Sequence, residues 1–284
     1  MRDSAAAARR EITIVEPPSL APRRVLHDLA RLARYSDLLY TLSLHRVRVR
    51  YKQSMLGLVW AIAQPLGLTV IYTLVFSRMA RVPSEGMPYA VFAYTALLPW
   101  IYFSSGLTGA THGIVSNAQF VTKAYFPREI LPLSYILAAV FDFIVGATVL
   151  AALMGAYGVT LTLHALWVVP IMLLATVFTT AVGLVLSALQ VWLRDFGLAL
   201  PLLLQVWMFA TPIVYPLSIV PAAWRGWYIL NPMVGIVENF RRVVLQGAQM
   251  EWSSFTASAV ISSVLLVAGY IYFKSVDATM ADVV

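Results

Sequence analysis

The sequence predicts an all-α polytopic membrane protein. We expect six transmembrane helices, an N-terminal interfacial amphipathic helix, and two short re-entrant outer helices between spans five and six. Composition supports this class, because 60% of the 284 residues are hydrophobic and only 12% are charged, whereas about a quarter of a soluble domain is charged. Charge distribution supports it as well. Eleven of the twenty Lys and Arg precede Met55, so the net charge of +7 points to an inner membrane surface rather than to nucleic acid.

The N-terminal region divides into two parts. Residues 1–24 are rich in Ala, Arg and Pro, and we expect a disordered cytoplasmic tail. Residues 25–53 carry apolar side chains at helical spacing opposite a basic face, which predicts an amphipathic helix on the membrane surface. Four cations follow one another near its end: Arg46, Arg48, Arg50 and Lys52. They can set topology and bind lipid, they can receive an anionic substrate headgroup, and the two interpretations are compatible.

The predicted transmembrane domain covers residues 54–275, followed by a cytoplasmic tail at 276–284. Because about twenty apolar residues cross the hydrocarbon core, we place the spans at 55–77, 89–111, 130–155, 163–189, 198–217 and 254–273. Gly155 and Gly158 separate the third span from the fourth. Asp142 is the only formally charged residue between Glu129 and Arg194. It has no obvious cationic partner in the sequence, and both a structural role and a role at a transport path stay open.

Two loops carry recognisable helical signals. The segment 112–132 can form a short amphipathic helix that ends before Pro127, and it could dock into a soluble partner or lie on the membrane. In the segment 216–253, Asn231 followed by a proline is a good helix start. An apolar stripe then lies opposite Glu238, Arg241 and Arg242. This pattern predicts two short helices that dip into the outer leaflet and return.

Several chemistries have no sequence support. The chain has no cysteine, its four histidines are scattered, and HExxH and GxSxG motifs are missing. The three lysines follow Tyr51, Thr122 and Phe273, so no GxxxxGK[ST] loop can cradle a nucleotide phosphate. The two halves of the chain lack the self-similarity expected of a secondary transporter. Energy for active transport would therefore come from a partner or from an ion gradient.

Four stretches together carry a family resemblance: "RYKQSMLGLVWAIAQPL", "FPREILPL", "LRDFGLALPLLLQVWMFATPIVYP" and "NPMVGIVENFRR". In this order and spacing, over about residues 35–275, the chain resembles the permease subunit of polysaccharide-exporting ABC transporters. The bias of Lys and Arg, fifteen on one side of the predicted spans against five on the other, places both termini in the cytoplasm. The resemblance implies a homodimer in the bacterial inner membrane. It also implies two separate nucleotide-binding subunits that hold ATP and Mg²⁺, so this chain would have no catalytic residue, metal or cofactor of its own.

The resemblance implies a substrate class, namely glycans linked to undecaprenyl diphosphate, and O-antigen is the first candidate among them. Two alternatives stay open, namely an exporter of the same architecture for a drug or small lipid, and a membrane-embedded glycosyl or phosphoglycosyl transferase. A hydrated polymer must slide without being held, so we expect aromatic and polar side chains to line its channel, with candidates Trp60, Gln64, Tyr72, Tyr94, Trp100, Tyr102, Trp207, Phe209 and Tyr215.

Three further groups of residues have predicted roles in substrate entry, in coupling to the ATPase and in the outer gate. The substrate headgroup entrance would consist of Arg46, Arg48, Arg50 and Lys52. Coupling to the ATPase would involve Phe120, Lys123, Tyr125, Arg128 and Glu129. The outer gate would contain Trp224, Trp227, Asn231, Glu238, Arg241 and Arg242.

Overall fold

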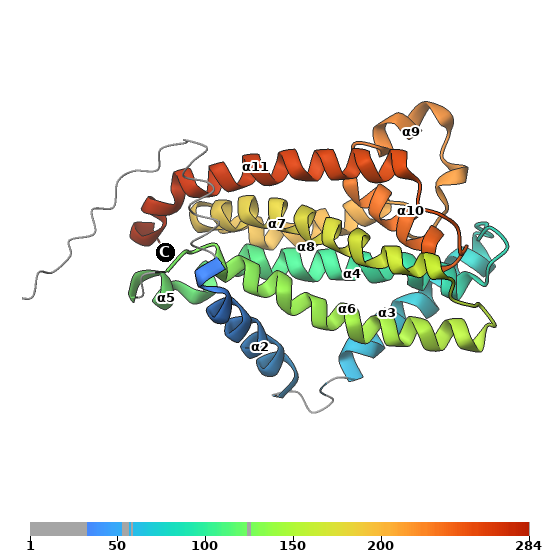
Figure 1. The fold of residues 1–284 in the computed structure, drawn as a ribbon, viewed down its shortest axis with the longest axis horizontal. Helices are drawn as coiled ribbons and strands as arrows, with labels where there is room; N and C mark the ends of the chain where they lie inside the picture. The colour runs from blue at the N-terminus through green and yellow to red at the C-terminus, as the bar shows by residue number, and fades with distance from the viewer. Residues whose placement is uncertain (1–32, 53–56, 58, 124–125, 284) are drawn as a thin grey trace, which may run out of the picture.

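The computed structural model describes residues 33–52, 57, 59–123 and 126–283, which form one elongated helical bundle (Figure 1). Every regular element in these ranges is a helix, as the sequence predicted. The predicted tail 1–24 and the first part of the predicted helix 25–53 lie outside the described residues. In chain order the elements are α2 (Ser36–Lys52), α3 (Val59–Tyr72), η1 (Thr73–Met79), α4 (Tyr89–His112), η2 (Val115–Asn117), α5 (Ala118–Lys123), α6 (Ile130–Ala156), η3 (Leu163–Trp167), α7 (Val168–Trp192), α8 (Asp195–Phe209), η4 (Leu217–Ile219), α9 (Ala222–Tyr228), α10 (Pro232–Val244) and α11 (Trp252–Val283).

Five helical stretches are long and apolar enough to cross a membrane: Val59–Met79, Tyr89–His112, Ile130–Ala156, Leu163–Trp192 and Trp252–Asp277. They coincide with predicted spans one, two, three, four and six. The predicted fifth span, 198–217, is occupied by α8, which has 15 residues. At about 1.5 Å per residue α8 is roughly 22 Å long, shorter than the ~30 Å hydrocarbon core. The described residues therefore contain five helices of membrane length rather than six.

The centre of the bundle is α4. Most of its residues are buried, and it packs against α3, α6, α7, α8 and α10. We call the two ends of the bundle the α5 end, where α5 and the C-terminus lie, and the α10 end, where α9 and α10 lie (Figure 1). A second apolar cluster lies at the α5 end and joins α5 and α6 to the last turns of α11 through Ile114, Val121, Leu131, Phe273 and Met280. Helix α11 continues through residues 276–283, where a separate tail was predicted.

The first span is not a regular α-helix along its whole length. Pro65 lies inside α3, where it cannot donate to the helix ladder. The hydroxyl of Thr69 donates to the Pro65 carbonyl at 2.8 Å, and the helix then widens into the π-helical stretch η1. Such wide turns occur frequently at functional sites. In this chain the irregular helix forms one wall of a cavity.

Candidate functional site

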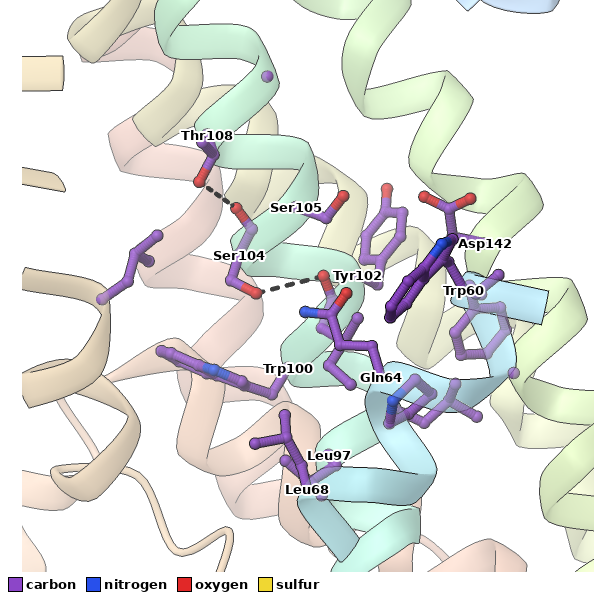
Figure 2. Close-up of a pocket in the computed structure, with 18 of the residues that line it drawn as sticks. Trp60, Gln64, Leu68, Leu97, Trp100, Tyr102, Ser104, Ser105, Thr108 and Asp142 are labelled. Atoms are coloured by element: carbon purple, nitrogen blue, oxygen red, sulfur yellow. Dashed lines mark hydrogen bonds between the residues drawn. The ribbon is translucent and has the colours of Figure 1, made fainter. Parts of the chain in front are cut away.

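A cavity of about 780 Å³ lies between α3, α4, α6 and α8, with the end of α2 at its edge. Five of the nine predicted channel residues line it: Trp60, Gln64, Tyr72, Trp100 and Tyr102. All of these except Tyr72 are labelled in Figure 2. Hydroxyl and amide groups also line it, from Ser104, Ser105, Thr108, Tyr135 and Gln205. The sequence pattern had drawn attention to the aromatics and missed the serines and threonine, because a hydroxyl inside an apolar helix does not reveal which way it faces.

The hydroxyls of Ser104 and Thr108 are already engaged as donors within α4. Thr108 Oγ1 donates to the Ser104 carbonyl at 2.7 Å, and Ser104 Oγ donates to the Ile101 carbonyl at 3.3 Å (Figure 2). Their oxygen lone pairs can still accept hydrogen bonds. This wall therefore offers acceptors and aromatic faces to a ligand, a combination that fits a polyhydroxylated molecule.

The other four predicted channel residues do not line this cavity. Tyr94 is buried, and its hydroxyl donates to the Gly146 carbonyl at 3.1 Å. Trp207 donates from Nε1 to Asn231 Oδ1 at 3.1 Å. Tyr215 donates to the Phe209 carbonyl at 2.7 Å, while the Phe209 side chain is half exposed on the surface of this chain. Tyr94 belongs to α4 and lies in the core of the bundle. For Trp207, Phe209 and Tyr215, channel lining stays a prediction that concerns the surface of α8 and of the irregular residues 210–216 that follow it.

The four predicted entrance cations divide between two faces of α2. Arg46 Nε donates to Ser134 Oγ of α6 at 2.7 Å, and its guanidinium lies 3.5 Å from the centre of the Tyr135 ring. Arg50 lies one turn further along and forms an ion pair with Asp142 of α6. Arg48 and Lys52 are exposed on another face. Helix α2 is thus docked on α6 through two of the cations.

The ion pair of Arg50 corrects the expectation that Asp142 has no cationic partner. Arg50 Nη1 donates to Asp142 Oδ2, and the hydroxyl of Tyr51 donates to Asp142 Oδ1. All three residues line the cavity. Sequence inspection missed the pair because Arg50 and Asp142 are 92 positions apart and come together only when α2 crosses α6.

At the α5 end, Arg128 and Glu129 bind the last turns of α11. Lys274 Nζ lies 2.8 Å from Oε1 of Glu129, whose side chain is 1% exposed. Arg128 Nη1 donates to the Asp277 carbonyl and to its Oδ1 atom, 3.1 Å away. These contacts, together with the second apolar cluster, hold the start of α6 against α11.

The segment predicted to couple to the ATPase contains the short helix α5, and its coupling role stays a prediction. Phe120 is half exposed on it, whereas Val121 is buried in the second apolar cluster. Tyr125 lies outside the described residues, as does the side chain of Lys123. An exposed aromatic on a short helix at the end of a bundle is a suitable contact for a soluble partner.

At the α10 end, Asn231 caps α10 as predicted, because its Oδ1 accepts a hydrogen bond from the backbone N–H of Met233 at 3.1 Å. Trp224 and Trp227 of α9 are exposed, as is Arg242. The predicted placement of Arg241 on an outward polar face is wrong. Its side chain is 1% exposed, since α10 is packed among α4, α7 and α11.

Arg241 binds the backbone that follows α8. Its Nη2 atom donates to the carbonyls of Pro212 and Ile213 at 2.8 and 3.1 Å, and its Nη1 atom donates to Glu238 Oε1 at 2.7 Å. The guanidinium also lies 3.9 Å from the ring centre of Phe92. Irregular backbone in an apolar environment needs internal partners for its polar groups. The buried arginine supplies them.

Burial disfavours the charged form of both members of this ion pair. It raises the pKa of the Glu238 carboxyl and lowers the pKa of the Arg241 guanidinium, because a low-dielectric environment disfavours each charged form. Their mutual attraction acts against both shifts. Loss of either partner would therefore leave the other in an unfavourable environment.

The chain belongs to the ABC-2 type transporter family, because the sequence model of that family matches residues 37–245. One relative is the O-antigen export system permease protein RfbA of Myxococcus xanthus, which is 31% identical over 86% of this chain and 94% of its own length. A protein of the same name from Klebsiella pneumoniae is 29% identical over 87% of this chain and 95% of its own length. The polysialic acid transport protein KpsM of Escherichia coli is 25% identical over 84% of this chain and 93% of its own length.

Proposed function

We propose that this chain is the membrane subunit of an ABC transporter that exports polysaccharide linked to undecaprenyl diphosphate, with O-antigen as the specific cargo. Two copies would form the path through the bacterial inner membrane, and two separate ATPase subunits would supply energy. The observation that carries the proposal is family membership together with near full-length similarity to O-antigen export permeases.

The chemistry of the cavity supports a glycan rather than a purely apolar cargo. Its walls combine Trp60, Trp100 and Tyr72 with the amides of Gln64 and Gln205. Aromatic faces can stack on sugar rings, while hydroxyl and amide groups exchange hydrogen bonds with them at modest net strength, about 0.5–1.5 kcal/mol each. Many weak, equivalent contacts would allow a polymer to advance stepwise.

The α8 region supports a sixth crossing. Helix α8 alone is short, but the irregular connector 210–216 extends it towards the α10 end, and Arg241 satisfies the carbonyls of Pro212 and Ile213. The hydroxyl of Tyr89 donates to the next carbonyl, that of Val214, at 2.7 Å. With these three carbonyls hydrogen-bonded inside the bundle, this part of the connector can lie at membrane depth. Helices α9 and α10 would then be the two re-entrant elements of the outer gate.

The positive-inside rule supports the orientation. With the α5 end in the cytoplasm, cytoplasmic segments contain fifteen Lys and Arg and outer segments contain five. Both termini would be cytoplasmic, and Phe120 of α5 would face the ATPase. Arg46, Arg48, Arg50 and Lys52 would lie at the inner leaflet, where a diphosphate headgroup enters beside the first span. Arg48 and Lys52 are free to meet it first, and Arg50 lies at the cavity itself.

Complementation tests the proposal. The gene would be expressed with and without that of its partner ATPase in a bacterium that makes O-antigen on its lipid carrier but lacks the export permease. We expect O-antigen on the cell surface only when both are present. Surface O-antigen without any ATPase, or lipid-linked glycan that accumulates inside despite both proteins, would contradict the proposal.

A further inference from the structure

The carboxylate of Asp142 has two different donors at the cavity wall. Arg50 donates to Oδ2 and Tyr51 donates to Oδ1. The Asp142 side chain is 14% exposed, whereas that of Arg50 is 39% exposed. Figure 2 shows Asp142 of α6 and Trp60 of α3 on the wall of the same cavity. The carboxylate is thus largely enclosed, while its cationic partner stays accessible to a ligand.

Arg50 is one of two cations that hold α2 on α6. Arg46 docks the same helix on α6 through Ser134 and Tyr135, one turn before Arg50. A guanidinium carries five N–H donors, and the contact with Asp142 uses the Nη1 group. If Arg50 turned towards a ligand, Tyr51 would still donate to Asp142. The carboxylate would then remain hydrogen-bonded, which reduces the cost of leaving a charge in an apolar environment.

We propose that Asp142 is an internal competitor for Arg50. An isoprenoid diphosphate headgroup would draw Arg50 away from Asp142 on entry, and Asp142 would recover it as the headgroup moves on. This inference rests on the proposed function, because it takes the diphosphate as the anionic part of the substrate. Diphosphate carries more negative charge than one carboxylate and matches the planar guanidinium with two oxygens, so it can win the exchange.

The competition has a kinetic purpose. A headgroup held by an uncontested arginine would bind tightly and leave slowly, since the interaction that favours entry also opposes release. Asp142 weakens the bound state in two ways, by competing for Arg50 and by repelling the anion nearby. Removing its charge should therefore tighten binding and reduce the maximal rate of export. A carboxylate that merely braces α2 against α6 would produce no tightening.

A binding experiment tests the exchange. The full chain would be reconstituted in phosphatidylcholine nanodiscs and titrated with farnesyl diphosphate, with farnesol as the uncharged comparison, and tryptophan fluorescence would report occupancy near Trp60. We expect Asp142→Asn to bind the diphosphate about tenfold more tightly. Tyr51→Phe should bind it several-fold more weakly, because Asp142 then depends on Arg50 alone. Asp37→Asn is the matched control, since it makes the same charge change on an exposed residue of α2 and should bind like the wild type.

The outcomes separate this inference from the proposed function. A wild-type protein that does not distinguish the diphosphate from farnesol would overturn both. A wild-type protein that prefers the diphosphate, combined with unchanged or weaker binding by Asp142→Asn, would overturn only the competition. If Asp142→Asn does not fold, as judged by thermal unfolding, Tyr51→Phe decides, and unchanged or tighter binding by that variant refutes the exchange. In cells with the partner ATPase, Asp142→Asn should export less O-antigen at saturating substrate despite its higher affinity.

Discussion

Replacing Arg241 with methionine should strongly destabilise the α10 end of the bundle. The change keeps an apolar stem of similar length but removes the donors to the carbonyls of Pro212 and Ile213 and the counter-ion of Glu238. Breaking a buried ion pair by removing one partner costs about 3–5 kcal/mol, and each buried acceptor left without a donor costs about 1–3 kcal/mol. These terms overlap, so we expect a loss of roughly 4 kcal/mol in the free energy of unfolding.

Two companion variants divide this loss into its parts. Glu238→Gln keeps both carbonyl contacts and should cost only about 1–2 kcal/mol. Combining it with Arg241→Met should recover some of the stability lost in the single variant, because no buried carboxylate is then left without its cation. Arg242→Met is the matched control. That neighbouring arginine is exposed and donates to the Gln249 carbonyl, so its loss should cost less than about 1 kcal/mol.

Denaturant unfolding in mixed micelles can measure these differences. Trp207 is a local reporter when the other seven tryptophans are replaced with phenylalanine in all the variants compared, because its Nε1 donates to Asn231 at the start of α10. Limited proteolysis of the connector 210–216 and of α9 provides a second readout, and Arg241→Met should be cleaved faster. If Arg241→Met were no less stable than Arg242→Met, then the connector's carbonyls would not depend on this arginine. The physical account of the sixth crossing would have to be abandoned.

Three further predictions address other parts of the molecule. Phe120→Ala should reduce export several-fold without lowering the unfolding temperature, because Phe120 is half exposed on α5; normal export would show that α5 is only a surface connection. Glu129→Lys and Lys274→Glu should each impair export and stability, whereas the double exchange should restore much of both by rebuilding the pair; no rescue would contradict a direct electrostatic contact. Arg50→Gln should raise the substrate concentration needed for half-maximal ATP hydrolysis by about tenfold or more, because one charge-assisted hydrogen bond contributes about 1.5–3 kcal/mol. An unchanged concentration dependence would limit this residue to anchoring α2.

Local sequence patterns were sufficient for much of the architecture. Long apolar runs specify membrane-length helices because lipid imposes a minimum length, and five of the six predicted spans coincide with such helices. The Asn-Pro pair at 231–232 predicted the start of α10, since a side-chain cap acts within two or three residues of itself. Charge bias along the chain likewise predicts orientation without any tertiary information. Each of these signals depends only on neighbouring residues.

The tertiary structure decided how the polar residues are used. Amphipathic spacing placed Arg241 on an outward face, but α10 is enclosed by three other helices, so the arginine points into the bundle and binds the backbone after α8. Asp142 pairs with Arg50, which is 92 positions away in the sequence. Only part of the predicted set of aromatic residues lines the cavity. An apolar span has little amphipathic pattern to indicate its rotation about its own axis, because lipid and protein interior are similarly apolar. Helix packing therefore determines which hydroxyl, charge or ring faces the path.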